Sequence, residues 1–337
     1  MVEREMIKKW GLPDVSDLQL YTILNTLTRK QMMIICDFLQ IVNRSNLKKG
    51  DIKAILHSDL YHYLAKYLQA MNDGQLQLLY ELLEKDYLSI DEYAWSHLYF
   101  FFQLGIAYPV GFQEKYGFFI PREIKRWIIE RLTPSLMRLF DRNNRVITFA
   151  YDCLKAYGLI HYQTFVYFYQ MKHPDDDVFH DVDLILRLES TFNGRFYANF
   201  QYFYDVTIKD QLSTFLNVHH RYHHIDYFQF QLNEDEFQRM FQEQEIWDIL
   251  EKPIRRLETK QKEDLLKWTI HQLHIGTGLS SLEERLLDEF PHLSRWTMWR
   301  FFRNVEKIYP YLRLWIFKGN RLIDLKLEDK HHLISKI

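Results

Sequence analysis

The stretch "DGQLQLLYELLEKDYLSIDEYAWSHLYFFFQLGIAYPV", residues 73–110, predicts two helices that lead into a β-strand. Asp73 belongs to the residue types that often cap a helix N-terminus, and leucines follow it at the spacing of a buried helical face. Gly105 stands where the second helix should end, because glycine readily adopts the left-handed conformation found there.

A β-hairpin is predicted directly after these helices. "IAYPV" (106–110) and "YGFFIP" (116–121) are β-rich, and "GFQEK" joins them with Gly111 in the expected loop. Two helices followed by a two-stranded hairpin is the order of a winged helix. Residues 73–131 are therefore predicted to form a winged-helix-like domain.

The second helix of this domain is a poor candidate for reading bases. "IDEYAWSHLYFFFQLG" (90–105) carries Asp91 and Glu92 and has no Arg or Lys. Base recognition and phosphate attraction both favour basic or amide side chains. If this domain contacts a nucleic-acid backbone, we expect the contacts to come from the wing and the helix that follows it.

The composition favours a mainly α-helical chain with small β-hairpins, built from several modules. The 337 residues are 47% hydrophobic and 26% charged, with only 11 Gly and 8 Pro, so long periodic segments should dominate. We predict four segments: a helical element (1–68), the winged-helix-like domain (73–131), an aromatic-rich helical domain with a β-hairpin (133–232) and a C-terminal helical domain (233–337).

Charge and cysteine usage narrow the class of protein. The formal net charge of -2 excludes a uniformly basic nucleic-acid coat but permits local basic patches. Cys36 and Cys153 lie in apolar runs, which argues against a disulfide framework or a cysteine-based zinc site and fits a reducing compartment. No apolar run reaches the length of a signal peptide core at the N-terminus or of a membrane span. We expect a cytoplasmic protein with no membrane contact and no cofactor.

A first basic set lies in "LTRKQMMIICDFLQIVNRSNLKKGDIKAILHSDL", residues 27–60. Its apolar spacing predicts two amphipathic helices around an extended connector, the first of them capped by Thr28. The connector and the second helix carry four cations: Arg44, Lys48, Lys49 and Lys53.

This segment resembles the helix–extended-loop–helix elements of SAP domains and of the N-terminal domain of Rho termination factor. The matching residues are Leu39, Ile41, Ser45, Leu47, Lys48 and Lys49. The resemblance implies a nucleic-acid-binding element. The alternative is a small helical hairpin whose basic face is merely solvated.

A second basic set runs from residue 114 to residue 145. Its eight cations are Lys115, Arg122, Lys125, Arg126, Arg131, Arg138, Arg142 and Arg145, and its four acids are Glu114, Glu123, Glu130 and Asp141. Arg122, Lys125 and Arg126 share one face of a predicted helix. The candidate phosphate contacts of the whole chain are Arg44, Lys48, Lys49, Lys53, Lys115, Arg122, Lys125 and Arg126.

The third segment is dense in aromatic residues. In "NRVITFAYDCLKAYGLIHYQTFVYFYQMKH", residues 144–173, they recur at helical spacing, which is more typical of a core than of a platform for stacking bases. "HPDDDVFHDVD" (173–183) lacks the pattern of a calcium-binding loop and is interpreted as a solvated helix start. Asn193-Gly194 predicts a hairpin turn between extended aromatic runs.

The stretch "NVHHRYHHIDYF", residues 217–228, contains two histidine pairs at i,i+4 spacing: His219/His223 and His220/His224. Such pairs can bind a metal, but adjacent pairs point about 100° apart on a helix and cannot all converge. Asp226 is the one nearby carboxylate. We therefore expect ordinary surface or packing histidines and no metal site, with protonated histidines binding phosphate as a further alternative.

Four phrases are similar to a group of uncharacterised bacterial proteins that often end in a SEC-C zinc-binding motif. They are "KAYGLIHYQTF" (155–165), "STFNGRFYANFQYFYD" (190–205), "RYHHIDYFQFQLNEDEF" (221–237) and "YLRLWIFKGNRLIDL" (311–325). The SEC-C motif requires clustered cysteines, and none follows Cys153. The resemblance therefore implies a fold and carries no zinc chemistry to this chain.

The sequence contains none of the motifs G-x-x-x-x-G-K-[ST], G-x-G-x-x-G or G-x-S-x-G, and no enzyme is predicted. The leading hypothesis is a non-enzymatic nucleic-acid-binding or regulatory protein that contacts DNA or RNA phosphates through basic helix faces. The alternatives are a protein–protein adaptor and a metal-dependent enzyme at residues 219–224. A contiguous positive face joining residues 44–53 to 115–131 favours nucleic acid, and a neutral apolar patch favours a protein partner.

Overall fold

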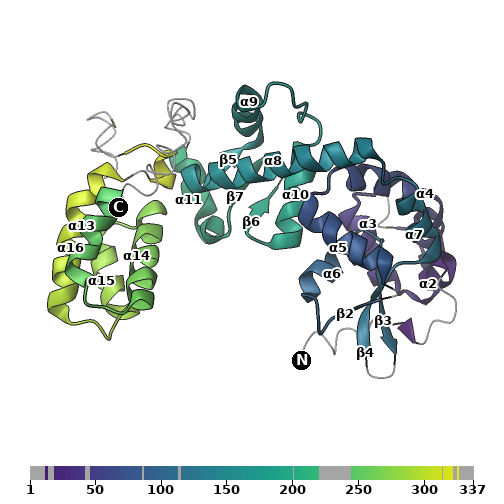
Figure 1. The fold of residues 1–337 in the computed structure, drawn as a ribbon, viewed down its shortest axis with the longest axis horizontal. Coiled ribbons are helices and arrows are strands. Elements are labelled where there is room, and N and C mark those ends of the chain that lie inside the picture. Colours follow the sequence, from purple (N-terminus) through teal and green to yellow (C-terminus); the bar gives the residue numbers. More distant parts are fainter. Residues whose placement is uncertain are drawn as a thin grey trace. The chain divides into compact units, whose positions relative to one another are not determined.

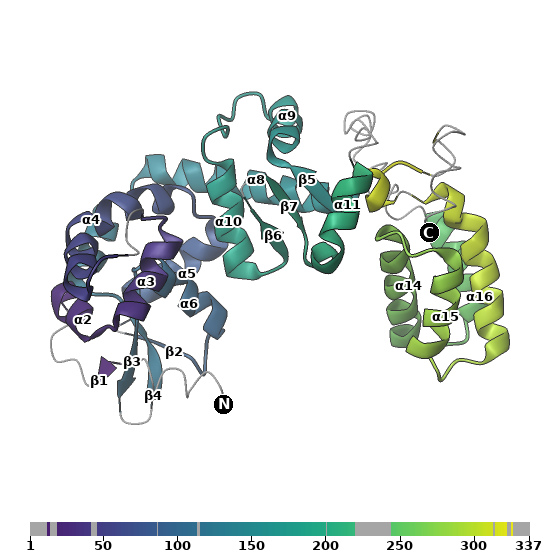
Figure 2. The ribbon, with the colours of Figure 1, turned by 180° about the vertical axis from the view of Figure 1, so that it is seen from behind.

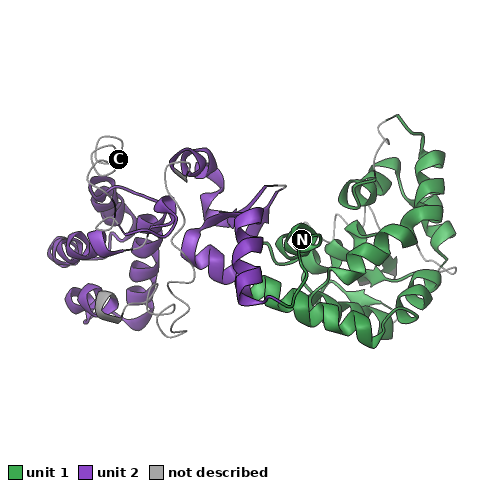
Figure 3. Cartoon of the chain, turned by 90° about the horizontal axis from the view of Figure 1, so that it is seen from above, with its two compact units in different colours: residues 1–148, 175–195 green, residues 149–174, 196–337 purple. Residues whose placement is uncertain are grey.

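The computed structural model describes residues 12–13, 19–41, 46–85, 87–112, 115–199, 201–219, 244–312, 314–321 and 325. They fold mainly into helices with two small sheets, so the predicted fold class is confirmed (Figure 1). The chain divides into two compact units, residues 1–148 with 175–195 and residues 149–174 with 196–337 (Figure 3). The predicted segment 133–232 contributes to both units, and the division into four segments stays a prediction.

The first unit is built from helices around a small sheet. Its elements are β1 (Leu12–Pro13), α2 (Leu20–Thr26), α3 (Arg29–Phe38), α4 (Lys49–Gln69), α5 (Asp73–Glu84), β2 (Leu88–Ser89), α6 (Trp95–Gln103), β3 (Tyr108–Phe112), β4 (Lys115–Phe119), α7 (Arg122–Ile129), the first part of α8 (Pro134–Tyr157) and α10 (Val182–Asn193). The leucines and phenylalanines of α4, α5 and α6 form much of its core.

The helix ends in this unit are determined by capping residues close to them in the sequence. Thr28 forms a capping box with Gln31, as its position in the sequence predicts. Gly105 has φ +70° directly after α6, which confirms the predicted helix end. The cap of α5 is one residue earlier than predicted, because Asn72 accepts a bond from the Gln75 amide while Asp73 occupies the first helical position.

The sheet of the first unit has the strand order β1-β3-β4-β2. Strands β3 and β4 form the predicted hairpin, β2 adds antiparallel to β4, and β1 adds parallel to β3. Gly111 pairs with Tyr116 inside the hairpin, so its predicted place in the loop is wrong. At Gly117 a Cβ would lie 2.3 Å from the Leu88 carbonyl oxygen, so glycine is what lets β2 approach β4.

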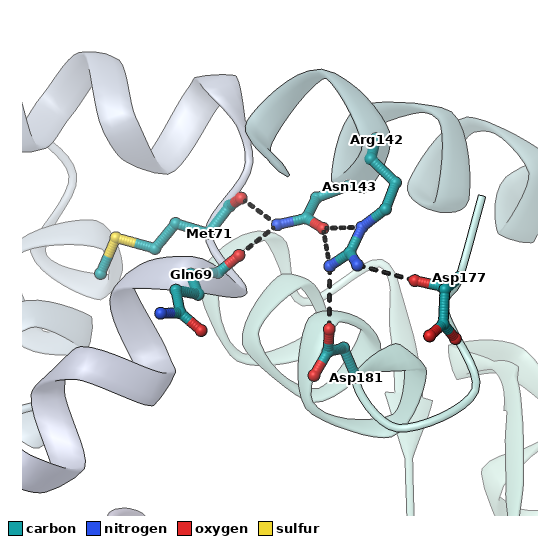
Figure 4. Close-up of polar contacts among 6 residues, drawn as sticks. All are labelled: Gln69, Met71, Arg142, Asn143, Asp177 and Asp181. Atoms are coloured by element: carbon teal, nitrogen blue, oxygen red, sulfur yellow. Dashed lines mark hydrogen bonds and ion pairs between the residues drawn. The ribbon is translucent and has the colours of Figure 1, made fainter. Parts of the chain in front are cut away.

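A buried asparagine ties α8 to the end of α4 (Figure 4). Asn143 is fully buried, and its Nδ2 donates to the carbonyl oxygens of Gln69 (2.8 Å) and Met71 (2.7 Å). The last carbonyls of a helix have no partner within the helix, so these bonds satisfy groups that would otherwise be buried without a donor. The Asn143 Oδ1 accepts from the Arg142 guanidinium at 3.2 and 3.0 Å.

The second unit combines the rest of α8, a three-stranded sheet and a group of C-terminal helices. Its further elements are β5 (Leu159–His161), α9 (Tyr162–Lys172), β6 (Phe196–Ala198), β7 (Tyr202–Asp205), η1 (Val206–Gln211), α11 (Leu212–His219), α13 (Gln244–Glu251), η3 (Lys252–Ile254), α14 (Thr259–His274), α15 (Leu279–Glu289), α16 (Arg295–Ile308), η4 (Tyr309–Tyr311) and η5 (Trp315–Phe317). The sheet order is β5-β7-β6, antiparallel throughout.

The hairpin of this sheet does not turn at Asn193-Gly194 as predicted. Gly194, with φ +63°, instead follows α10 as its left-handed C-terminal residue. The turn between β6 and β7 begins at Asn199, whose Oδ1 accepts from the amides of Gln201 and Tyr202 at 2.9 and 2.8 Å. The Asn-Gly pair therefore marked a left-handed residue that ends a helix and does not form the hairpin turn.

Most aromatic residues of α8 and α9 form core, as predicted, whereas Tyr167 of α9 is exposed. Phe149, Phe165 and Tyr169 are buried and pack with ring centroids 5.4 to 6.1 Å apart. Phe203 of β7 joins them through an edge-to-face contact with Phe165. The arrangement leaves these rings no exposed face on which a base could stack.

His274 in this unit is expected to make the stability of the protein depend on pH. The His274 ring stacks on Trp315 at 5.0 Å; burial, with a smaller effect from nearby His271, lowers the pKa of His274 from 6.5 to about 3. The folded state therefore resists protonation of His274, whereas His274 in the unfolded chain is protonated near pH 6.5. The stability that is present above pH 6.5 is consequently lost as the pH falls toward 3. His274 as a whole residue is only half-buried, which limits the effect.

We therefore expect the free energy of unfolding to fall by about 1–2 kcal/mol more in the wild type than in His274→Gln when the pH is lowered from 7 to 5. Urea unfolding of both proteins at the two pH values measures this difference. Equal pH dependence in the two proteins would contradict the assigned role of His274.

Candidate nucleic-acid interface

Two of the predicted lysines are held on the surface of α4 by helix α2. The Nζ of Lys49 donates to the carbonyl oxygen of Asn25 at 3.0 Å, and the Nζ of Lys53 donates to its Oδ1 at 2.8 Å. The Nζ of Lys53 also lies 4.5 Å from the ring centroid of Tyr21, which is half exposed. Both lysines are thus positioned by neutral groups.

An aromatic row continues from these lysines along α4 to α7. Lys53, His57 and Tyr61 stand on successive turns of α4, which places them in one stripe. The His57 ring lies 5.7 Å from that of Tyr21, and the Tyr61 ring lies 5.5 Å from that of Trp127 on α7.

The row ends at Arg131, whose Cζ lies 4.1 Å from the centre of the Trp127 ring. We call this set the cation–aromatic ridge: Tyr21, Lys49, Lys53, His57, Tyr61, Trp127 and Arg131. It runs over α2, α4 and α7 of the first unit, where α2 contacts both other helices (Figure 1); Figure 2 shows α2 and α4 from behind. Cations therefore stand at both ends of a row of aromatic rings.

Helix α7 presents different residues to three sides. Ile124 and Ile128 are buried in the core, and Trp127 faces α4. At about 100° per residue, Arg122 and Arg126 point away from the core, about 140° and 100° around the helix axis from Trp127. Lys125 lies on the flank of α7 opposite to Trp127, and the three predicted cations fall within an arc of about 100° on the outward side of the helix.

Two acids lie close to the ridge, and each has a local role. The Glu123 carboxylate accepts from the Leu20 amide at 3.3 and 3.2 Å, which caps the start of α2. Desolvation, with Glu123 as a smaller cause, raises the pKa of Tyr61. Glu130 pairs with the Arg126 Nε at 2.9 Å, but these side chains are 84% (Arg126) and 54% (Glu130) exposed, so the pair is weak.

Two further cations of the second basic set are neutralised by the acidic stretch 175–181. The Arg142 Nη2 pairs with the Asp181 carboxylate at 3.0 Å, and its Nη1 donates to the Asp177 carbonyl oxygen at 2.8 Å (Figure 4). Arg145 makes a bidentate pair with Asp176 at 2.8 and 3.0 Å. The positive excess counted between residues 114 and 145 is therefore smaller in the folded unit, because its C-terminal part serves a structural purpose.

The remaining candidate residues have separate positions. Lys48 is exposed at the N-terminus of α4, where its amide donates to the Asp51 carboxylate at 3.0 Å. The backbone of Lys115 pairs with Phe112 in the hairpin. Arg44 lies outside the described residues. Sequence reasoning missed the aromatic members of the ridge and also Arg131 as a contact, although the i,i+4 spacing of Lys53, His57 and Tyr61 was a usable signal.

Metal and membrane chemistry find no support in the part of the chain that the structure describes. It contains no group of three or more His, Cys, Asp or Glu residues placed to hold a metal ion. His220 to His224 lie outside the described residues, so the interpretation of that histidine cluster is untested. No helix among the described residues is long and apolar enough to cross a bilayer.

Comparisons with known proteins identify no relative. No protein-family model matches the chain, and neither the curated proteins nor the solved structures give a match.

Proposed function

We propose that this chain binds nucleic acid through its phosphate backbone, with the cation–aromatic ridge and the outward arginines of α7 as the contact surface. The observation that carries the proposal is the ridge itself, in which two ring pairs, Tyr21/His57 and Tyr61/Trp127, lie between cations from α4 and from the end of α7. The residues that were separate sets in the sequence, 48–53 and 122–131, lie on neighbouring helices of one unit.

The charge state of the ridge supports a polyanionic ligand. Within the described residues, Lys49, Lys53 and Arg131 pair with no carboxylate; their partners are carbonyl or amide oxygens, a hydroxyl and aromatic rings. Their charges remain available to phosphates, whose condensed counterions are released on binding. The contacts to Asn25, Tyr21 and Trp127 also restrict the lysine and arginine rotamers before binding, which lowers the entropic cost.

The proposed mode is backbone binding without base reading. Helix α6 presents no cation, and phosphate contacts position a protein on nucleic acid without carrying sequence information. The strand order β3-β4-β2 and the hairpin support the proposed winged-helix-like unit, and the succession of α3 and α4 supports the proposed SAP-like element. Such a protein would act as a sequence-tolerant binder or regulator and perform no catalysis of its own.

The competing proposal is a protein–protein adaptor that uses the same half-exposed rings. The two functions differ in their dependence on salt, because phosphate binding releases counterions in proportion to the number of contacts. A protein docked mainly on the aromatic rings would keep its affinity as the salt concentration rises.

The double variant Lys49→Ala/Lys53→Ala is expected to bind a short DNA duplex at least about tenfold more weakly than the wild type at 0.1 M salt, because two phosphate contacts are lost. Fluorescence anisotropy with a labelled duplex measures the change. Lys66→Ala is the matched control, since Lys66 is an exposed lysine of the same helix about 140° around the axis from Tyr61. Equal affinities for the double variant and the control would refute the proposed surface.

A further inference from the structure

The outer face of α16 is a second concentration of cations and aromatic rings, in the second unit. The helix buries one face through Met298, Phe301, Phe302, Val305 and Ile308. Trp296, Arg300, Arg303 and Lys307 are exposed and fall within an arc of about 60° on the opposite side. These four residues form a stripe, here called the α16 stripe, that spans about 16 Å along the helix axis.

Each exposed tryptophan of this helix is paired with an arginine. The Arg300 Cζ lies 4.7 Å from the centre of the Trp296 ring, and the Arg303 Cζ lies 6.0 Å from that of Trp299. The two tryptophans are 64% and 55% exposed, although tryptophan is highly buried on average in folded proteins. Large exposed rings beside uncompensated charge are typical of a surface that binds something.

The charges around the stripe restrict the kind of ligand that this face of α16 can bind. Glu306 is the one acid of α16, and it forms an exposed ion pair with Arg303 at 3.2 Å, which contributes little. Arg300 and Lys307 make no ion pair with any of the described residues. The face therefore presents a net positive charge next to flat apolar rings, a combination complementary to phosphates and bases together.

We propose that the outer face of α16 binds single-stranded nucleic acid, with bases stacked on Trp296 and Trp299 or on their arginines and with phosphates on Arg300, Arg303 and Lys307. Indole rings and guanidinium planes both accept a stacked base, and a single strand exposes the base faces that a duplex hides. This site is separate from the cation–aromatic ridge.

The neighbouring helix also favours a single strand over a duplex. Helix α15 packs against α16, and its exposed residues include the acids Glu283, Glu284 and Asp288. A duplex is wide and carries phosphates on two strands, so it would bring charge close to these carboxylates. A single strand confined to the α16 stripe would meet its cations and rings, with Glu306 as the one acid of the helix beside them.

The test uses the full chain in the Lys49→Ala/Lys53→Ala background, so that the ridge and α16 are measured separately. The probe is a labelled oligothymidine of about 12 nucleotides, compared with a duplex of the same length. Trp296→Ala/Trp299→Ala is expected to weaken binding to the single strand at least about tenfold, since stacking contributes about 1–3 kcal/mol per base, and to leave duplex binding unchanged. Phe179→Ala, which removes an exposed ring elsewhere, is the control.

A second variant tests the charges. Arg300→Gln/Arg303→Gln should make the plot of log affinity against log salt less steep by about 1.4 for the single strand. Arg255→Gln/Arg256→Gln removes two exposed arginines of the same unit and should leave the slope unchanged. Unchanged single-strand affinity in the tryptophan variant, or an equal loss on the duplex, overturns the proposal. So does a change in oligomeric mass without a change in strand affinity, which would assign this face to self-association.

Discussion

Replacing Asn143 by leucine is expected to lower the free energy of unfolding by about 3 kcal/mol, because the carbonyl oxygens of Gln69 and Met71 lose their donor in a buried site. Leucine is branched at the same atom but is larger than asparagine, so overpacking adds to the lost hydrogen bonds. The Arg142 guanidinium would also lose an acceptor, which weakens its hold on the stretch that contains Asp181. Urea unfolding of the wild type and the variant measures the change.

Two further variants show whether the donor group of Asn143 is responsible. Asn143→Asp keeps the shape and still accepts from Arg142, but a carboxylate cannot donate to the two carbonyls, so the loss should be as large as with leucine. Asn144→Ala is the matched control: its Oδ1 accepts one partly exposed bond from the Asp73 amide, and its loss should stay below about 1 kcal/mol. If Asn143→Leu unfolds at the same urea concentration as the wild type, the carbonyl oxygens of Gln69 and Met71 must find other donors.

Replacing Gly158 by alanine is the second change with a large expected effect. Gly158 has φ +66°, which a residue with a Cβ adopts at a cost of about 1 kcal/mol. The new Cβ would also lie 2.5 Å from Trp315 Cδ2 and 2.8 Å from Ile208 Cδ1, far inside contact distance. Trp315 cannot move freely, because its Nε1 donates to the Lys155 carbonyl oxygen at 2.8 Å. We expect a total loss of about 3 kcal/mol in the free energy of unfolding.

Gly194→Ala separates the two causes of this loss. Gly194 has nearly the same φ, +63°, but a Cβ there would meet no atom within 4 Å. Its loss should therefore be the backbone cost alone, about 1 kcal/mol. Thermal and urea unfolding of the two variants give the comparison, and equal losses would show that the Trp315 contact relaxes at no cost.

Local signals in the sequence predicted much of the fold. Thr28 and Gly105 occupy the helix ends that their types favour, because a cap depends on a few neighbouring atoms. The aromatic spacing of α8 and α9 predicted core, since apolar residues on one helical face must be buried somewhere. The hairpin of β3 and β4 followed from β-rich runs around a short loop.

The predictions were wrong where the same local sequence signal fits two structural settings. They were also wrong where a residue far away in the chain determines the contact. Gly194 supplies a left-handed residue that serves a helix end as well as a hairpin turn. Arg142 and Arg145 counted as free cations, because their partners Asp181 and Asp176 are more than thirty residues away in the chain. Pairing of that kind depends on the tertiary fold, which periodicity does not specify.

The candidate interface was predictable only in part for the same reason. Lys49 and Lys53 are visible as a basic helix start, but the rings beside them come from three helices. The contacts of Trp127 with Tyr61 and Arg131 make it the link between the two basic sets, and these contacts depend on the tertiary fold. A tertiary arrangement therefore turned scattered cations into one candidate surface.

The salt dependence of duplex binding tests the central claim most directly. With phosphates at Lys49, Lys53, Arg122, Arg126 and Arg131, log affinity should fall against log salt with a slope of about −4.5, and Lys49→Ala/Lys53→Ala should reduce its steepness by about 2. Anisotropy titrations between low and moderate salt supply both slopes. Absence of binding at low salt, or equal slopes for the two proteins, would contradict the assignment of the ridge to a phosphate backbone.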